Sequence, residues 1–150
     1  SHPTTRLCLE WLEGNVTPGA SLLDYGCGSG ILAIAAARLG AGEVSGVDID
    51  PLAVEAAKAN AERNAVSARF ADSAEALAGE YDLVVANILS NPLRVLAPAI
   101  CAHVRSGGRL ALSGILREQA DEIIAIYAPW VALRVADVRE DWVCLSGTRS

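Results

Sequence analysis

The sequence has 150 residues, of which 52% are apolar, and a formal net charge of -6 at pH 7, so it is long enough to form one domain with a buried core. No apolar run reaches the roughly 18 residues of a membrane span, and no basic segment followed by a short apolar run marks a secretory signal, so we expect a cytoplasmic protein with no membrane partner. The negative charge and the scattered Lys and Arg residues disfavour direct nucleic-acid binding and would attract a basic protein.

The first half of the chain repeats a strand followed by a helix. Apolar spacing, Gly and Pro positions and strand-like runs predict, in order, a helix over 4–13, a strand over 21–25, a helix over 31–39, a strand over 43–48 and a helix over 52–64. Asp50 and Pro51 precede the last of these and suit its N-cap and first position. This alternation is typical of β-α units in a parallel sheet.

The second half continues the alternation until the last two strands. We expect strands over 68–71, 81–86 and, after a Gly107-Gly108 turn, 109–112, helices over 92–104 and 117–127, and final strands over 130–138 and 142–148. Three residues between the final strands are too few for a parallel crossover, so that pair should be antiparallel. The predicted fold class is therefore α/β, with a mostly parallel sheet covered by helices on both faces.

The turn after the first strand predicts which ligand binds. Gly26, Gly28 and Gly30 form a G-x-G-x-G pattern, and Ile31 stands where a dinucleotide fingerprint requires its third glycine. Asp24, two residues ahead, would repel a pyrophosphate but would attract the ammonium and sulfonium of S-adenosylmethionine. The turn therefore favours this methyl donor over NAD, whose oxidoreductases are the alternative.

Acidic residues follow the next two strands. Asp48 ends the second strand, where open α/β sheets place an acid that accepts hydrogen bonds from ribose hydroxyls. Its neighbour Ile49 is expected at the same site, whereas Asp50 is expected to cap the next helix. Asp72, after the third strand, is either an acceptor for the adenine amine or an exposed loop acid.

The fourth strand ends at Asn87, at the edge of the sheet where such folds bind their ligands. Deprotonating a lysine at pH 7 costs roughly 4.6 kcal/mol, a cost that an apolar pocket lowers. The Asn87 carbonyl and a nearby backbone carbonyl, which we assign to Leu89, would then accept N–H bonds and aim the amine lone pair at the methyl group. Both are the candidate catalytic residues, and Asn91, before a proline, is expected to be an N-cap.

Four cysteines lie far apart in the sequence without a C-x-x-C pair: Cys8, Cys27, Cys101 and Cys144. This spacing argues against a zinc site and against a disulfide framework, so we predict buried free thiols and no metal. The absence of methionine indicates an excised domain, which we expect to occupy residues 1–150.

Several segments together resemble the PrmA-type methyltransferases, which methylate amino groups of the large-subunit ribosomal protein L-eleven. The resemblance spans nearly the whole chain, and its most specific parts are the His-Pro-Thr-Thr start, the Asn-Ile-Leu turn and the Ser-Gly-Ile-Leu strand. The matching segments are 2–6, 23–32, 46–51, 86–89 and 112–116.

This resemblance implies a class I methyltransferase (Rossmann-like) fold with a seven-stranded sheet, whose last strand is antiparallel. It also implies that Thr4 or Thr5 holds the methionine end of the donor and that Asn87 meets the acceptor amine, leaving S-adenosylhomocysteine as the product. On composition alone, the segment containing the two threonines is simply a helix start with a threonine cap. By the same resemblance, we expect the sequence to lack the family's N-terminal recognition domain and the Gly-rich segment before His2.

The leading hypothesis is that a monomer methylates a basic ribosomal protein, and two alternatives stay open beside it. One keeps the methyl donor but changes the acceptor to another protein or a small-molecule amine. The other is a domain that binds the donor but is inactive in isolation, because the recognition domain is absent.

Overall fold

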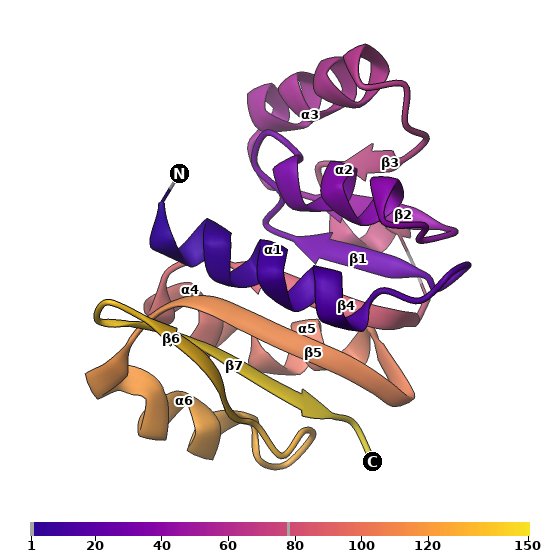
Figure 1. Ribbon diagram of the computed structural model, residues 1–150. Helices are drawn as coiled ribbons and strands as arrows, with labels where there is room; N and C mark the ends of the chain where they lie inside the picture. Colours follow the sequence, from indigo (N-terminus) through magenta and orange to yellow (C-terminus); the bar gives the residue numbers. More distant parts are fainter. Residues whose placement is uncertain (1, 78) are drawn as a thin grey trace.

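The computed structural model describes residues 2–77 and 79–150 and shows a seven-stranded sheet between two layers of helices (Figure 1). The order across the sheet is β3-β2-β1-β4-β5-β7-β6, which confirms the predicted α/β class. The strands are β1 (Leu22–Tyr25), β2 (Val44–Val47), β3 (Arg69–Ala71), β4 (Tyr81–Asn87), β5 (Val104–Leu116), β6 (Arg134–Arg139) and β7 (Trp142–Thr148).

Each face of the sheet carries its own apolar core. Side chains of α1, α2 and α3 form one core with alternate residues of the strands, such as Leu22 and Val85, and α4, α5 and α6 form the other with residues such as Leu23 and Val84. The helices are α1 (Pro3–Asn15), α2 (Ile31–Arg38), α3 (Pro51–Arg63), α4 (Ser90–Val95), α5 (Ala97–Ala102) and α6 (Ala120–Tyr127), with short 3-10 turns at Ala74–Leu77 and Arg117–Gln119. None of the helices in this described part is both long and apolar enough to cross a membrane.

Strands β1 to β5 are parallel, and the two C-terminal strands run as predicted. β7 pairs antiparallel with both β5 and β6, so it is the reversed strand of the sheet. The parallel strands consequently place their carboxyl ends at one edge of the sheet, where open α/β folds bind ligands.

Several predicted boundaries in the second half are wrong. The helix expected over 92–104 is two helices separated at Leu96, because Pro98 has no N–H with which to continue a single helix. The strand expected over 109–112 is longer, because β5 begins at Val104. The residues Gly107-Gly108, expected to form a turn before it, lie inside β5, where the pairing register with β4 shifts.

The strand expected from residue 130 begins later, at Arg134. The N–H groups of Trp130 and Val131 both donate to the carbonyl of Tyr127, so these residues still belong to the turn that ends α6. Val131 makes only an isolated bridge to Arg149.

The start of α1 also differs from the prediction, because its cap is a histidine. The side chain of His2 accepts a hydrogen bond from the N–H of Thr4, so neither threonine is the N-cap. The ring of His2 packs edge-on against Trp142 of β7, with ring centroids 5.3 Å apart. The first turn of α1 is thereby fixed beside the carboxyl edge of the sheet.

Candidate active site

The glycine-rich turn lies between β1 and α2 and requires its glycines for two reasons. Gly26, Gly28 and Gly30 have φ values of +82°, +53° and +87°, which side chains rarely allow. A Cβ on Gly26 would also lie 2.6 Å from Ile88, and one on Gly30 would lie 3.1 Å from Ala57 of α3. The turn therefore presents bare backbone toward the carboxyl edge of the sheet.

Asp48 connects this turn to the end of β2. One carboxylate oxygen accepts the N–H of Gly28 at 2.9 Å, and the other accepts the N–H of Asp50 at 3.0 Å. Each oxygen keeps a further lone pair, so the carboxylate is oriented but can still accept bonds from a ligand. Asp50 caps α3 by accepting the N–H of Leu52, which confirms its predicted role.

Asp24 lies behind the turn, with only 1% of its surface exposed. Burial is the main reason that the pKa of its carboxyl is raised to about 7, and the nearby negative charge of Asp48 raises it further. The N–H of Ala33 lowers this pKa. That N–H does not complete a hydrogen bond, since neither carboxylate oxygen has a partner among the described residues. A buried carboxylate without a partner favours a cation next to it.

A mostly apolar cavity of about 250 Å³ opens beside the glycine turn and Asp48. Ile49 and Asp72 are both exposed, Ile49 with 92% of its surface accessible. The cavity is lined by Tyr25, Gly26, Val47, Asp48, Ile49, Asp72, Ser73, Ala74, Ile88, Pro92 and Leu96. Apolar walls with carboxylates at the rim suit a flat ring joined to a polar sugar.

Asn87, at the end of β4, lies against the start of α1. Its side-chain N–H donates to the hydroxyl of Thr5 at 3.4 Å, a long hydrogen bond that leaves the side-chain carbonyl oxygen of Asn87 free of this contact. Thr4 is buried and its hydroxyl bonds to the ring of His2. The structure therefore brings Thr5 and Asn87 together, although they are 82 positions apart in the sequence.

Leu89 occupies a different structural role from the rest of the predicted set. Its side chain is 69% exposed, and its carbonyl accepts the N–H of Leu93 in the first turn of α4. Leu89 is thus the N-cap of α4, and the expectation that Asn91 caps a helix is wrong, because Asn91 lies inside α4 and bonds to Arg94. A carbonyl has two lone pairs, so one on Leu89 stays available.

The four cysteines are free and buried, as predicted. Burial raises the pKa of each thiol, to about 12 for Cys27, where Asp24 and Asp48 add to the effect, to about 12 for Cys144, to about 11 for Cys101, and further still for Cys8. Cys27 in the glycine turn is therefore a neutral thiol, and thiolate chemistry is not expected there. Residues 2–77 and 79–150 contain no cluster of three side chains arranged to hold a metal ion.

The whole chain, residues 1–150, matches the family described as "Ribosomal protein L11 methyltransferase (PrmA)". It belongs to this family. Two curated relatives carry the same name, those of Dechloromonas aromatica, 81% identical over 149 residues, and Cupriavidus taiwanensis, 62% identical over 149 residues. Each comparison covers 99% of this chain and 50% of the relative, so the chain spans half the length of these L11 methyltransferases.

Solved structures of methyltransferases share this fold, and one of them is an L11 methylase. The chain superposes on the ribosomal protein L11 methylase of Lactobacillus delbrueckii subsp. bulgaricus with a TM-score of 0.93 and 32% identity, covering 100% of this chain and 80% of that one. It also resembles a 16S rRNA N2 G1207 methyltransferase of T. thermophilus, solved with AdoMet and guanosine, with a TM-score of 0.81 and 26% identity over 100% of this chain and 44% of that one. The L11 methyltransferase segments named above lie largely at the carboxyl edge of the sheet or in the first turn of α1.

Sequence reasoning missed the apolar wall of the cavity. Its lining includes Tyr25, Ile88, Pro92 and Leu96. Tyr25 ends β1 and Ile88 follows β4, whereas Pro92 lies in α4 and Leu96 directly after it. In the sequence, an apolar residue at any of these positions is equally compatible with a place in the core. Asn60 was also missed: its side chain donates to the Ser29 carbonyl at 2.9 Å and so ties α3 to the glycine turn.

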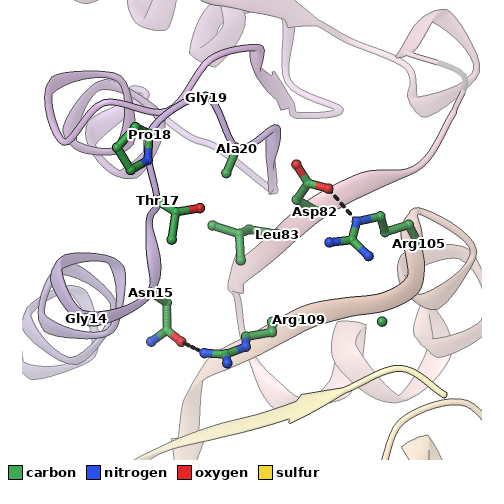
Figure 2. Close-up of a pocket in the computed structure, with 11 residues that line it drawn as sticks. Gly14, Asn15, Thr17, Pro18, Gly19, Ala20, Asp82, Leu83, Arg105 and Arg109 are labelled. Atoms are coloured by element: carbon green, nitrogen blue, oxygen red, sulfur yellow. Dashed lines mark hydrogen bonds and ion pairs between the residues drawn. The ribbon is translucent and has the colours of Figure 1, made fainter.

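A wider pocket, of about 600 Å³, lies at the opposite edge of the sheet, where β1 and β4 begin (Figure 2). Its charged and amide side chains are already paired with one another, Arg105 with Asp82 and Arg109 with Asn15. Asp82 also accepts the N–H of Ser21, and these contacts hold its pKa below the ordinary value. The polar contacts in this pocket therefore hold neighbouring loops together. The smaller cavity at the carboxyl edge is the candidate active site.

Proposed function

We propose that this chain is a catalytic domain that transfers a methyl group from S-adenosylmethionine to amino groups of ribosomal protein L11, on lysine side chains or the N-terminus. The observation that carries this proposal is the buried Asp24 carboxylate, which has no hydrogen-bond partner among residues 2–77 and 79–150 and lies directly before three glycines with positive φ. A cationic nucleoside satisfies that carboxylate, whereas a pyrophosphate would be repelled by it.

The donor-binding residues divide the ligand between them. Asp48, already oriented by two N–H groups, accepts bonds from the ribose hydroxyls. The apolar cavity takes the adenine ring, with Ile49 against it and Asp72 at the rim near its amine. Gly26, Gly28 and Gly30 let the methionine part approach the backbone, and Thr4 and Thr5 lie at the neighbouring end of α1. When bound, the donor supplies an electrophilic methyl group on a sulfonium.

The acceptor residues position an amine for in-line attack. The side-chain carbonyl oxygen of Asn87, whose N–H is directed to Thr5, accepts one amine N–H, and the Leu89 carbonyl accepts another through its second lone pair. The amine lone pair then points along the sulfur–methyl bond, so the new carbon–nitrogen bond forms as that bond breaks, leaving S-adenosylhomocysteine. The amine's proton passes to water, and positioning supplies most of the acceleration.

The substrate and setting are also part of the proposal. The net charge of -6 favours a basic protein as partner and disfavours direct contact with nucleic acid. A ribosomal protein substrate places the reaction in the cytoplasm. Residues 1–150 act as one catalytic domain, since all the strands from β1 to β7 share one sheet.

Calorimetric titration of S-adenosylhomocysteine into the wild type and Asp48→Ala tests donor binding. We expect the variant to lose about 10- to 150-fold in affinity, the equivalent of about 1.5–3 kcal/mol for hydrogen bonds to a charged group. Asp121→Ala is the comparison variant, because Asp121 is an exposed aspartate of α6 outside the cavity lining, and it should keep the affinity of the wild type. Unchanged binding by Asp48→Ala, or tighter binding of NAD by the wild type, would overturn the donor assignment.

Transfer of a labelled methyl group tests the acceptor. Under single-turnover conditions, L11 should be labelled in preference to free lysine and to an unrelated basic protein. Labelling of free amines alone would indicate a different acceptor. Donor binding without any labelling would indicate a domain that binds the donor but is inactive in isolation.

A further inference from the structure

β5 contains a bulge beside the candidate acceptor site. In its pairing with β7, Leu112 lies opposite Leu145 and Ile115 lies opposite Val143, so β5 has one residue more than β7 over this stretch. The additional residue falls within Ser113-Gly114, which we call the β5 bulge. Bulges redirect side chains and are frequent next to active sites.

The first residue of the bulge holds α1. The hydroxyl of Ser113 donates to the backbone carbonyl of Thr4 at 3.0 Å, and Ser113 is fully buried. Thr4 lies in the first turn of α1, immediately before Thr5, which accepts the side-chain N–H of Asn87. The hydrogen bond from Ser113 therefore fixes the turn that places Thr5 against Asn87.

The second residue holds the turn after β4. Gly114 has a φ of +87°, and a Cβ there would lie 2.3 Å from the carbonyl oxygen of Ile88 and 3.0 Å from its carbonyl carbon. The side chain of Ile88 in turn lies against Gly26 of the glycine turn, where a Cβ would approach within 2.6 Å. The backbone of Ile88 is thus closely fitted between β5 and the donor-binding turn.

These two contacts converge on the same pair of side chains. Asn87 directly precedes Ile88 and pairs with Ser113 in the sheet, and Leu89 directly follows Ile88. Resting on the proposed function, we propose that the β5 bulge is the positioning element of the acceptor site: Ser113 places Thr5, and Gly114 places the Asn87–Leu89 turn. Neither residue touches the reacting atoms, and neither belongs to the cavity that receives the donor.

Four single variants test this proposal. Ser113→Ala removes only the hydroxyl. Its control Ser45→Ala removes the hydroxyl of a buried serine in β2 that has no hydrogen-bond partner in the described part of the chain. Gly114→Ala adds a methyl group against Ile88, and its control Gly19→Ala adds one at a similar φ, +82°, with no atom within 4 Å. Each pair thus shares its chemistry and differs in the contact made.

We expect Ser113→Ala and Gly114→Ala to slow single-turnover methyl transfer to L11 by roughly 10- to 100-fold, because a displacement of about 1 Å costs on the order of 100-fold. Thr5 and Ile88 also lie beside the proposed donor site, so the affinity for S-adenosylhomocysteine should fall in both variants, but by less than the transfer rate, and the controls should keep both properties. A rate that falls no further than the affinity, or a rate unchanged from the controls, would overturn the proposal.

A spectroscopic readout separates this proposal from the proposed function. The side-chain amide signal of Asn87 in a 15N spectrum should shift in Ser113→Ala and stay in place in Ser45→Ala, whether or not the wild type methylates L11. An unmoved signal would overturn the positioning role even in an active enzyme. If Gly114→Ala does not fold, Ser113→Ala still decides the question, since it removes a single oxygen.

Discussion

The buried carboxylate of Asp24, which has no partner among the described residues, should lower the unfolding free energy of the protein and favour a cationic ligand. The folded chain keeps the Asp24 proton up to a pKa of about 7, whereas the unfolded chain releases it near 3.8. Between these values the folded state binds more protons than the unfolded state, so the free energy of unfolding falls as pH rises. The full penalty, about 3 pK units, is on the order of 4 kcal/mol above pH 7.

The perturbation that exposes this penalty is Asp24→Asn, which keeps the shape of the side chain and removes its charge. Relative to the wild type, the variant should gain stability as pH rises. Between pH 5.5 and pH 8 we expect the difference in unfolding free energy between the two proteins to change by about 2 kcal/mol. This value follows because pH 5.5 lies roughly 1.5 pK units below the folded pKa, and each unit corresponds to about 1.4 kcal/mol. Any constant cost of burying the amide cancels in this comparison.

The assay is urea denaturation of both proteins at the two pH values, with Asp50→Asn as the matched control. Asp50 is exposed and caps α3, and asparagine caps equally well, so this control should keep the unfolding free energy of the wild type. At pH 8, Asp24→Asn should also bind S-adenosylhomocysteine more weakly than the wild type, and at pH 5.5 the two should converge. A stability difference that is the same at both pH values would refute the reasoning, because it would mean that Asp24 titrates like a hydrated carboxyl.

Three further predictions concern the scaffold. Tyr127→Phe should lower the unfolding free energy by about 1–3 kcal/mol in urea denaturation, because the buried Tyr127 hydroxyl donates to the Leu93 carbonyl at 2.7 Å; no change would mean that water replaces it. Gly46→Ala should lower the unfolding free energy by about 1–3 kcal/mol through overpacking, because its Cβ would lie 2.7 Å from Phe70. Its control Gly14→Ala, whose Cβ would have no atom within 4 Å, should keep the stability of the wild type in the same thermal melt. Asp82→Asn should lower the unfolding free energy at pH 7, because Ser21 and Arg105 lower the pKa of Asp82 in the folded state. This loss of stability should shrink as pH falls below about 4. A loss that persists unchanged at pH 3 would contradict this reasoning.

The parts of the fold that depend on near neighbours in the chain were predictable. The alternation of strands and helices follows from local apolar spacing, and the α3 start follows from Asp50 and Pro51, which are adjacent to it. The antiparallel C-terminal pair follows from the shortness of its connection. Two of the boundaries that failed, at Leu96 and Val104, lie where a proline or a glycine pair acts differently inside a packed sheet than in an isolated turn.

The candidate site divides in the same way. Its residue types were legible in the sequence, because a G-x-G-x-G turn with Asp24 before it and Asp48 after it constrains the ligand's charge by itself. Which of these groups has a partner was decided by the tertiary structure, which leaves Asp24 without one and gives Asp48 two backbone donors. The contact of Thr5 with Asn87 and that of Gly114 with Ile88 join segments far apart in the chain. Such contacts arise only when the sheet assembles, since local propensity carries no information about which distant strand end a residue will face.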